Sequence, residues 1–128
     1  MTQEQTHLLI NHALCGDLLE ITDEGSKVTL TLTQDMAVDD HDLVHGGFIF
    51  GLADYAAMVA VNHPNVVLGS SSFKFLKPCV VGDNLLAEAT KQDVEGKKIT
   101  VALDVRRGDE VVASGEFVCF ALEKHVLD

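Results

Sequence analysis

Basic residues are almost absent from the first part of this chain. Residues 1–73 contain one, Lys27, against ten acidic residues, and the whole 128-residue chain has a net charge of −11. Proteins that hold nucleic acid neutralise its phosphates with lysine and arginine, so this balance argues against general nucleic-acid binding. The eight basic residues of 74–128 could form a local positive patch for a phosphorylated small molecule, or could simply solvate the ends of strands.

Long hydrophobic runs and paired cysteines are missing as well. No stretch approaches the roughly 20 apolar residues of a membrane-spanning helix, and the N-terminus lacks the basic and apolar segments of a signal peptide. We therefore expect a cytoplasmic protein that binds no membrane. Cys15, Cys79 and Cys119 lie outside any CxxC spacing, so we expect reduced thiols, with Cys79 and Cys119 buried among apolar neighbours.

The chain does contain clear helical and strand patterns. Its hydrophobic content of 47% suits one domain with a single packed core over residues 1–128. Residues 3–14 are expected to form a short amphipathic helix with Leu8, Leu9 and Leu14 inward. A second helix of about four turns is expected from residue 46 to residue 62. Six segments have strand patterns, namely 18–22, 27–33, 66–76, 84–92, 97–106 and 110–122, and residues 34–45 form a polar loop.

The order of these elements predicts the architecture. The last strands leave no room for helices between them, so the sheet should be mainly antiparallel. The helix at 46–62 is almost uniformly apolar, so it must be buried on more than one side, and the sheet must curl around it. We therefore expect an α+β hotdog fold, in which a curled antiparallel sheet wraps one long central helix.

One carboxylate interrupts this apolar helix. Asp54 is the only charged residue from Phe48 to Val61, and a charge in such surroundings costs several kcal/mol unless it is paired or protonated. Gly46 and Gly47 open the helix, where unpaired N–H groups and the helix dipole favour an oxyanion or a carbonyl oxygen. The pair could also serve only close packing at the helix start.

The spacing of these two features has a consequence for assembly. Eight residues of helix separate Asp54 from Gly46 by about 12 Å. A base or nucleophile and an oxyanion donor must converge on one reacting carbon, so these two residues can do so only if they come from different subunits. Any such chemistry requires a dimer with two equivalent sites.

These residues resemble a known family signature. The stretch His45-Gly-Gly-Phe-Ile-Phe-Gly-Leu-Ala-Asp54-Tyr-Ala-Ala is similar to the motif of the PaaI-like acyl-CoA thioesterases of the hotdog superfamily. Phe73-Lys-Phe-Leu-Lys-Pro78, followed by Gly82-Asp83-Asn-Leu-Leu-Ala-Glu-Ala89, resembles the next strand, turn and strand of that family. The resemblance implies an acyl-CoA thioesterase that works as a dimer or a dimer of dimers. It implies no resident cofactor, because coenzyme A arrives as part of the substrate.

The resemblance also assigns roles to residues. Gly46, with Gly47 beside it, would supply the amide that polarises the thioester carbonyl, and Asp54 of the second subunit would be the nucleophile or general base. His45 would contact the thioester or shape the loop. The acyl group would lie along apolar walls, and basic residues of 74–107 would be available to the CoA phosphates. The side chains expected to bind substrate are Phe48, Phe50, Tyr55, Met58, Ser71, Ser72, Lys77 and Arg106.

Three alternatives stay open at this point. A hotdog domain can bind acyl-CoA without turnover, as a sensor or regulator, and Asp39 adds a negative charge where PaaI-like proteins commonly have asparagine. The hotdog dehydratases and hydratases share the architecture, but they use a catalytic histidine in a motif that this chain lacks. His41, His45 and the neighbouring aspartates could ligate a divalent metal, although we expect none.

Overall fold

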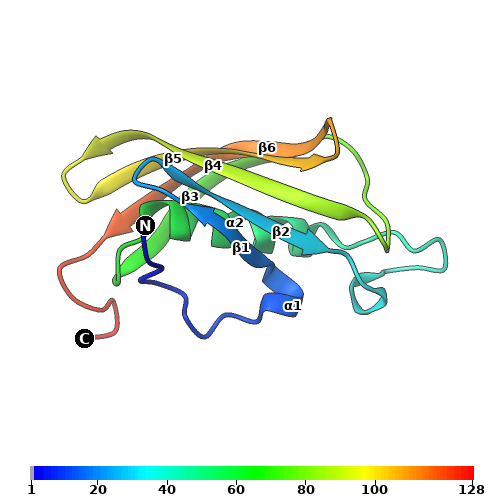
Figure 1. The fold of residues 1–128 in the computed structure, drawn as a ribbon, viewed down its shortest axis with the longest axis horizontal. Coiled ribbons are helices and arrows are strands. Elements are labelled where there is room, and N and C mark those ends of the chain that lie inside the picture. The colour runs from blue at the N-terminus through cyan, green and yellow to red at the C-terminus, as the bar shows by residue number, and fades with distance from the viewer. Residues whose placement is uncertain (1) are drawn as a thin grey trace.

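Six strands form one antiparallel sheet in the computed structural model, which describes residues 2–128 (Figure 1). The strands are β1 (Asp17–Ile21), β2 (Gly25–Thr31), β3 (Val66–Phe75), β4 (Asn84–Glu95), β5 (Lys98–Arg107) and β6 (Glu110–Ala121). Their spatial order is β1-β2-β4-β5-β6-β3, which leaves β1 and β3 at the two edges. The expected strands match within three residues at each end, and the expected antiparallel pairing is confirmed.

The central helix α2 (Gly46–Val61) lies against this sheet and contacts every strand of it. A buried hydrogen bond from Ser26 Oγ to the carbonyl oxygen of Ala56 (2.7 Å) joins the helix to β2. The helix ends at Asn62, which has a left-handed φ of 55°, and Pro64 follows two residues later. The predicted central helix and hotdog arrangement are confirmed. None of the helices in residues 2–128 could span a bilayer.

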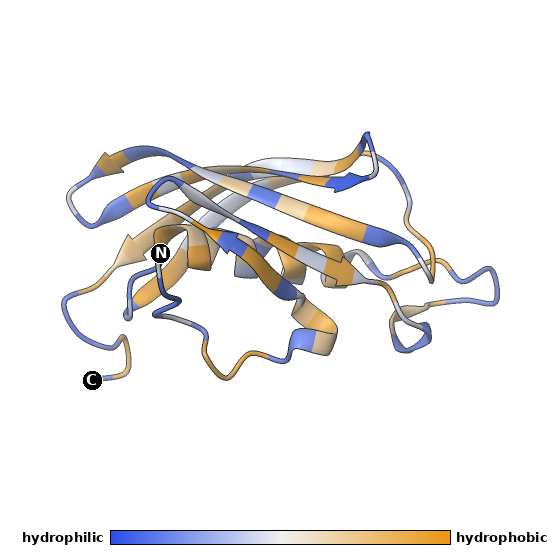
Figure 2. Cartoon of the chain, in the orientation of Figure 1, coloured by the Kyte–Doolittle hydropathy of each residue, from blue (hydrophilic) through white to orange (hydrophobic). Residues whose placement is uncertain are grey.

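Alternating side chains form the core between sheet and helix. Along β5, every second residue from Ile99 to Val105 is buried, as the period-2 pattern predicts. Figure 2 shows hydrophobic and hydrophilic residues following one another in short blocks along the strands of the sheet. Phe50 of α2, Phe73 of β3 and Phe117 of β6 form an aromatic cluster, with ring centroids 5.3 to 5.8 Å apart. This cluster holds the edge strand β3 against the helix. Cys79 and Cys119 are buried free thiols, as expected.

The N-terminal segment differs from its prediction. The helix expected over residues 3–14 is wrong, because only α1 (His12–Cys15) is helical there. His7 has a φ of 56°, a backbone conformation that cannot continue a right-handed helix. Leu8 and Leu9, expected inward, are 65% and 100% exposed.

The physical reason lies in hydrogen bonds to α2. Gln5 N–H donates to Asn62 Oδ1 (2.8 Å), and Asn62 Nδ2 donates to the Gln3 carbonyl oxygen (2.9 Å). Nearer the middle of the helix, Tyr55 Oη donates to Glu4 Oε2 (2.7 Å). An isolated helix of about 12 residues is marginal in water, so these tertiary contacts outweigh the helical preference. Residues 3–11 therefore run across α2 as an irregular segment, the N-terminal strap.

Candidate active site

The N-terminus of α2 presents a free backbone amide. His45 is the N-cap residue, and its Nδ1 accepts a hydrogen bond from Gly47 N–H at 2.7 Å. The Gly46 N–H group, in contrast, has no acceptor within residues 2–128. Because Nδ1 is an acceptor, the neutral imidazole carries its proton on Nε2. The helix start therefore offers one backbone donor and, one residue away, a ring N–H group.

The backbone just ahead of this amide is held from two directions. His45 N–H donates to the Met36 carbonyl oxygen (3.0 Å), and Val44 N–H donates to the Cys79 carbonyl oxygen (2.9 Å). Met36 and Cys79 are both buried, so these acceptors belong to the rigid part of the molecule. Gly46 N–H consequently has a fixed direction, as an oxyanion donor requires.

A side chain at either glycine would crowd a neighbouring ring. A Cβ atom at Gly46 would lie 3.1 Å from the ring of Phe75, and a Cβ atom at Gly47 would lie 2.7 Å from His45 Nδ1. The first glycine leaves room for the ring and the second for the cap. Phe75 is 55% exposed and forms a wall beside the free amide. Phe75 was not among the predicted site residues, although the alternation Phe73-Lys74-Phe75 places both rings on one face of β3.

Asp54 lies about two turns farther along α2. It is half-buried, and its Oδ1 is buried without a hydrogen-bond partner within residues 2–128. Burial raises the pKa of the Asp54 carboxyl above its ordinary value, and the nearby His7 acts in the opposite direction. A desolvated carboxylate without a partner is a stronger base and nucleophile than a solvated one. His7 was missed from the sequence because only the N-terminal strap brings it close to α2.

The apolar residues predicted to bind substrate fall into two groups. Phe48 is half-buried beside the cap, with its ring centroid 6.1 Å from that of His45. Phe50 belongs to the aromatic cluster of the core. Tyr55 and Met58 are each only 1% exposed, so within this chain they are core residues and do not line an open surface.

The two predicted serines lie on opposite faces of β3. Ser71 shares the helix-facing side with Phe73 and Phe75, and it is exposed. Ser72 lines an open groove of about 670 Å³ on the other face of the sheet, away from α2. Within one chain, therefore, only Ser71 shares a face with Phe75 and the helix start.

Lys77 and Arg106, the two basic residues expected to bind substrate, each form an ion pair with a carboxylate of this chain. Lys77 Nζ lies 3.8 Å from Glu110 Oε2, and Arg106 Nε lies 3.2 Å from Glu88 Oε1. Arg106 also lines the groove on the sheet face away from α2, so it does not share a surface with Gly46.

The acidic loop organises itself through its own backbone. Asp39 Oδ1 accepts hydrogen bonds from the N–H groups of His41 (2.9 Å) and Leu43 (3.2 Å). An asparagine side-chain oxygen could accept the same two bonds, so this loop geometry does not require the charge of Asp39. His41 Nδ1 lies 3.2 Å from Asp40 Oδ1. Across residues 2–128, no three histidine, cysteine or acidic side chains are grouped as metal ligands would be.

Comparison with known sequences identifies the family. Residues 41–114, which include both Gly46 and Asp54, match the family described as the thioesterase superfamily. The chain belongs to this superfamily. A crystal structure of an uncharacterized protein from Pyrococcus horikoshii, PH1136, has the same fold. Its TM-score is 0.98 and its sequence identity 49%, over 99% of this chain and 98% of that one.

Three curated relatives extend the comparison. Methylthioribose-1-phosphate isomerase of Aquifex aeolicus is 46% identical over 88% of this chain, which corresponds to 25% of that protein. Transcription factor FapR of Caldanaerobacter subterraneus subsp. tengcongensis is 30% identical over 93% of this chain and 60% of the relative. Acyl-coenzyme A thioesterase PaaI of Escherichia coli is 34% identical over 67% of this chain and 66% of the relative. The chain thus spans between a quarter and about two thirds of the length of these relatives, and the predicted resemblance to PaaI is confirmed.

Proposed function

We propose that this protein is a thioesterase that hydrolyses acyl-CoA at a site shared by two copies of the chain. The observation that carries the proposal is the unpartnered, buried Asp54 Oδ1 on the helix whose first amide, Gly46 N–H, is free. The similarity to a relative named acyl-coenzyme A thioesterase supports the substrate class.

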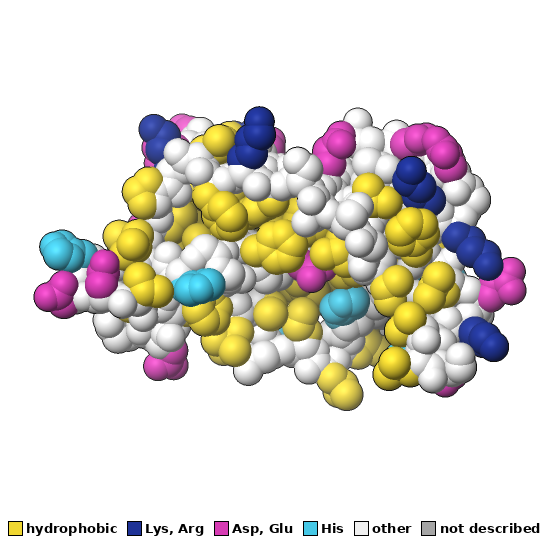
Figure 3. Space-filling view, turned by 180° about the vertical axis from the view of Figure 1, so that it is seen from behind, with side chains coloured by type: hydrophobic (Ala, Val, Ile, Leu, Met, Phe, Trp, Pro, Cys, Tyr) yellow, Lys and Arg dark blue, Asp and Glu magenta, His cyan; other side chains and the backbone are white. Residues whose placement is uncertain are grey.

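A second copy of the chain would complete the site. Leu43, Phe75, Leu76 and Val80 are exposed apolar residues near the start of α2, and hydrophobic side chains gather on the face that Figure 3 shows, with histidine and acidic side chains among them. Contiguous apolar surface and an open strand edge such as that of β3 both favour pairing with another chain. A two-fold axis between antiparallel α2 helices would bring Asp54 of one subunit to Gly46 of the other.

The proposed reaction uses each group once. Gly46 N–H donates to the thioester carbonyl oxygen, and the hydrogen bond strengthens as negative charge develops on that oxygen. Asp54 takes a proton from water, whose oxygen bonds to the carbonyl carbon, or Asp54 attacks that carbon itself and water hydrolyses the resulting anhydride. The carbon–sulfur bond breaks and its electron pair leaves on the thiolate. One proton of the water passes to sulfur, carried by Asp54 in the first route, and the other goes to solvent as the product acid ionises. The products are a carboxylate and free coenzyme A.

Binding of acyl-CoA without turnover is the second candidate. The similarity to a transcription factor over 93% of this chain favours it. A binding module, however, gains nothing from a desolvated carboxylate in an apolar helix, so we rank hydrolysis first.

A substrate panel tests the proposal directly. Acetyl-, hexanoyl-, palmitoyl-, phenylacetyl- and benzoyl-CoA are incubated with the protein, and released thiol is followed with a thiol reagent. We expect release from at least one of them. Binding by calorimetry without release would support the second candidate, and neither binding nor release would overturn both.

Two variants of His45 separate capping from substrate contact. Asparagine is a good N-cap, so His45→Asn should keep the stability of the parent, whereas His45→Ala should lose about 1 kcal/mol of unfolding free energy. We expect both variants to lose about tenfold in kcat/KM, because each removes the ring N–H that lies one residue from the free amide. Thermal unfolding and thiol release measure the two effects. Full activity in His45→Asn would leave capping as the role of the histidine.

A further inference from the structure

The surroundings of the candidate oxyanion amide are acidic. Three segments meet at the start of α2, namely 34–45, 74–83 and 107–110. They are joined there by the bridge between Leu43 and Val80 and by the contact of Arg107 with Pro78. Together they carry seven acidic and three basic residues. An anionic group that approaches Gly46 along this surface therefore meets a net negative field.

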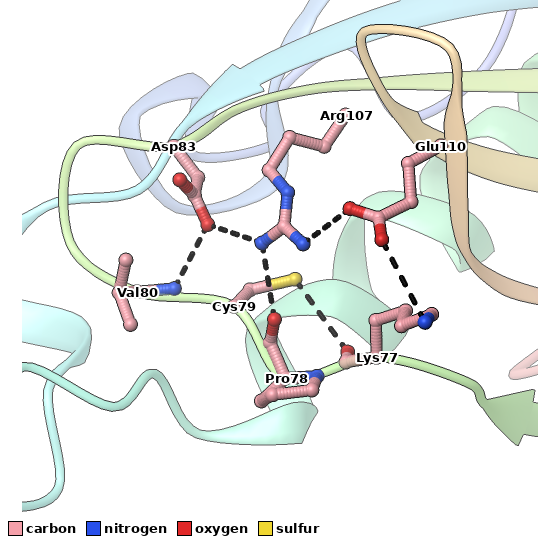
Figure 4. Close-up of polar contacts among 7 residues, drawn as sticks. All are labelled: Lys77, Pro78, Cys79, Val80, Asp83, Arg107 and Glu110. Carbon is pink, nitrogen blue, oxygen red and sulfur yellow. Dashed lines mark hydrogen bonds and ion pairs between the residues drawn. The ribbon is translucent and has the colours of Figure 1, made fainter.

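Two of the three basic residues of these segments, Lys77 and Arg107, are bound to carboxylates of the same chain (Figure 4). Arg107 Nη1 donates to Asp83 Oδ2 (2.8 Å) and to the Pro78 carbonyl oxygen (3.0 Å), while its Nη2 donates to Glu110 Oε1 (2.6 Å). Lys77 Nζ approaches the other oxygen of Glu110. A phosphate that recruited Lys77 or Arg107 would leave these carboxylates without their partners, so little net attraction would result.

The remaining cation of these segments faces elsewhere. Lys74 lines the groove on the sheet face away from α2, together with Arg106. Glu88, Asp104 and Glu116 line the same groove, and Arg106 lies 3.2 Å from Glu88 and 3.6 Å from Asp104. Acidic side chains outnumber basic ones on this surface too. A second copy of the chain would add its own net charge of −11.

We infer that the site selects the acyl group and the pantetheine arm of a thioester and gains no binding from the nucleotide of coenzyme A. This inference rests on the proposed function and specifies its substrate class. Uncharged thioesters of pantetheine or N-acetylcysteamine are substrates as good as the CoA thioester of the same acyl group. The three phosphate groups of CoA lie away from the reacting carbon and form no ion pair with the protein.

A comparison of carriers tests this inference. The acyl group preferred in the substrate panel is presented on CoA, on pantetheine and on N-acetylcysteamine, at about 10 mM and about 200 mM salt, where the screening length falls from about 30 Å to below about 10 Å. We expect kcat/KM for acyl-pantetheine to equal or exceed that for acyl-CoA at low salt. Added salt should raise the acyl-CoA value about two- to fivefold and leave the neutral thioesters unchanged.

A charge reversal sharpens the test. The Asp40 side chain is 96% exposed, and within residues 2–128 its one ion pair is with the exposed neighbour His41, so Asp40→Lys changes the charge without removing a bond to the rest of the fold. Asp93→Lys, in β4 near the β4–β5 turn, makes the same change at the opposite end of the molecule from the 34–45 loop (Figure 1). At low salt, Asp40→Lys should raise kcat/KM for acyl-CoA about threefold and leave acyl-pantetheine unchanged, whereas Asp93→Lys should change neither.

The outcomes separate the two proposals. A strong preference for acyl-CoA over acyl-pantetheine, with kcat/KM that falls as salt rises, would overturn this inference and leave the thioesterase proposal intact. Hydrolysis of no carrier would overturn the thioesterase proposal, and this inference with it. Equal responses of Asp40→Lys and Asp93→Lys would contradict the acidic surface as the source of the effect.

Discussion

Replacement of Asp54 by asparagine should lower kcat for the preferred acyl-CoA by about 10³-fold. Asparagine has nearly the same shape, but its amide can neither take a proton from water nor attack the thioester carbon. Thiol release measures the loss, and size-exclusion chromatography checks that the oligomer is unchanged. Equal rates for the parent and the variant would show that Asp54 is not catalytic.

The same variant should be more stable than the parent at neutral pH. Because burial raises the pKa of Asp54, the folded protein binds this proton more tightly than the unfolded chain does. Stability therefore falls as pH rises through the raised pKa, and the penalty is fully present above it. Asparagine carries no such charge, so the advantage of Asp54→Asn in thermal unfolding should widen from acid to neutral pH. Joint loss of activity and stability would indicate a structural role instead.

Removal of the Gly46 amide proton should have an effect nearly as large. Gly46→Pro should lower kcat by about 10²- to 10³-fold, because proline has no N–H group to donate to the oxyanion. Proline is well accepted at the first position of a helix, and His45, with φ −61° and ψ 130°, already has the conformation that a residue before proline prefers. Helix α2 should therefore remain folded.

Gly46→Ala is the matched control. It adds a Cβ atom beside the Phe75 ring, as proline does, but it keeps the amide. We expect Gly46→Ala to retain most of the kcat that Gly46→Pro loses. Equal losses in both variants would attribute the effect to crowding against Phe75 rather than to the hydrogen bond.

Mixing the two inactive chains tests the shared site. A dimer of one Asp54→Asn chain and one Gly46→Pro chain has one site with both groups intact and one with neither. Random mixing should therefore restore about a quarter of the parental activity. Activity that stays at the level of the separate variants would contradict a site built from two subunits.

The elements that were predicted correctly are those with strong local patterns. The apolar run from Gly46 to Val61 and the alternation along β5 each specify their structure through residues close in sequence. The prediction of a helix in the N-terminal segment was wrong for the opposite reason. Its apolar spacing suits a helix, but its hydrogen bonds go to Asn62, more than fifty residues away, and local spacing holds no information about such a partner.

The candidate site likewise has features that local sequence predicts and features that depend on distant residues. Gly46 and Asp54 share one helix, so their separation follows from helical geometry alone. The ring of Phe75 beside Gly46 and the proximity of His7 to Asp54 depend on how distant segments pack. The ion pair of Lys77 depends on the β5–β6 turn, so a cation that looks available in the sequence is engaged in the structure.

The bonds of Arg107 to Pro78, Asp83 and Glu110 affect how the protein responds to heating. The penalty for removing charged groups from water falls as temperature rises, so linked ion pairs gain importance relative to apolar packing. Arg107 ties the end of β5 to the segment between β3 and β4, and the Cys79 carbonyl of that segment accepts the hydrogen bond of Val44, two residues before Gly46. The start of α2 is thus anchored to a part of the surface whose cohesion increases with temperature. Alignment of the free amide should accordingly persist in warm conditions that loosen the exposed N-terminal strap.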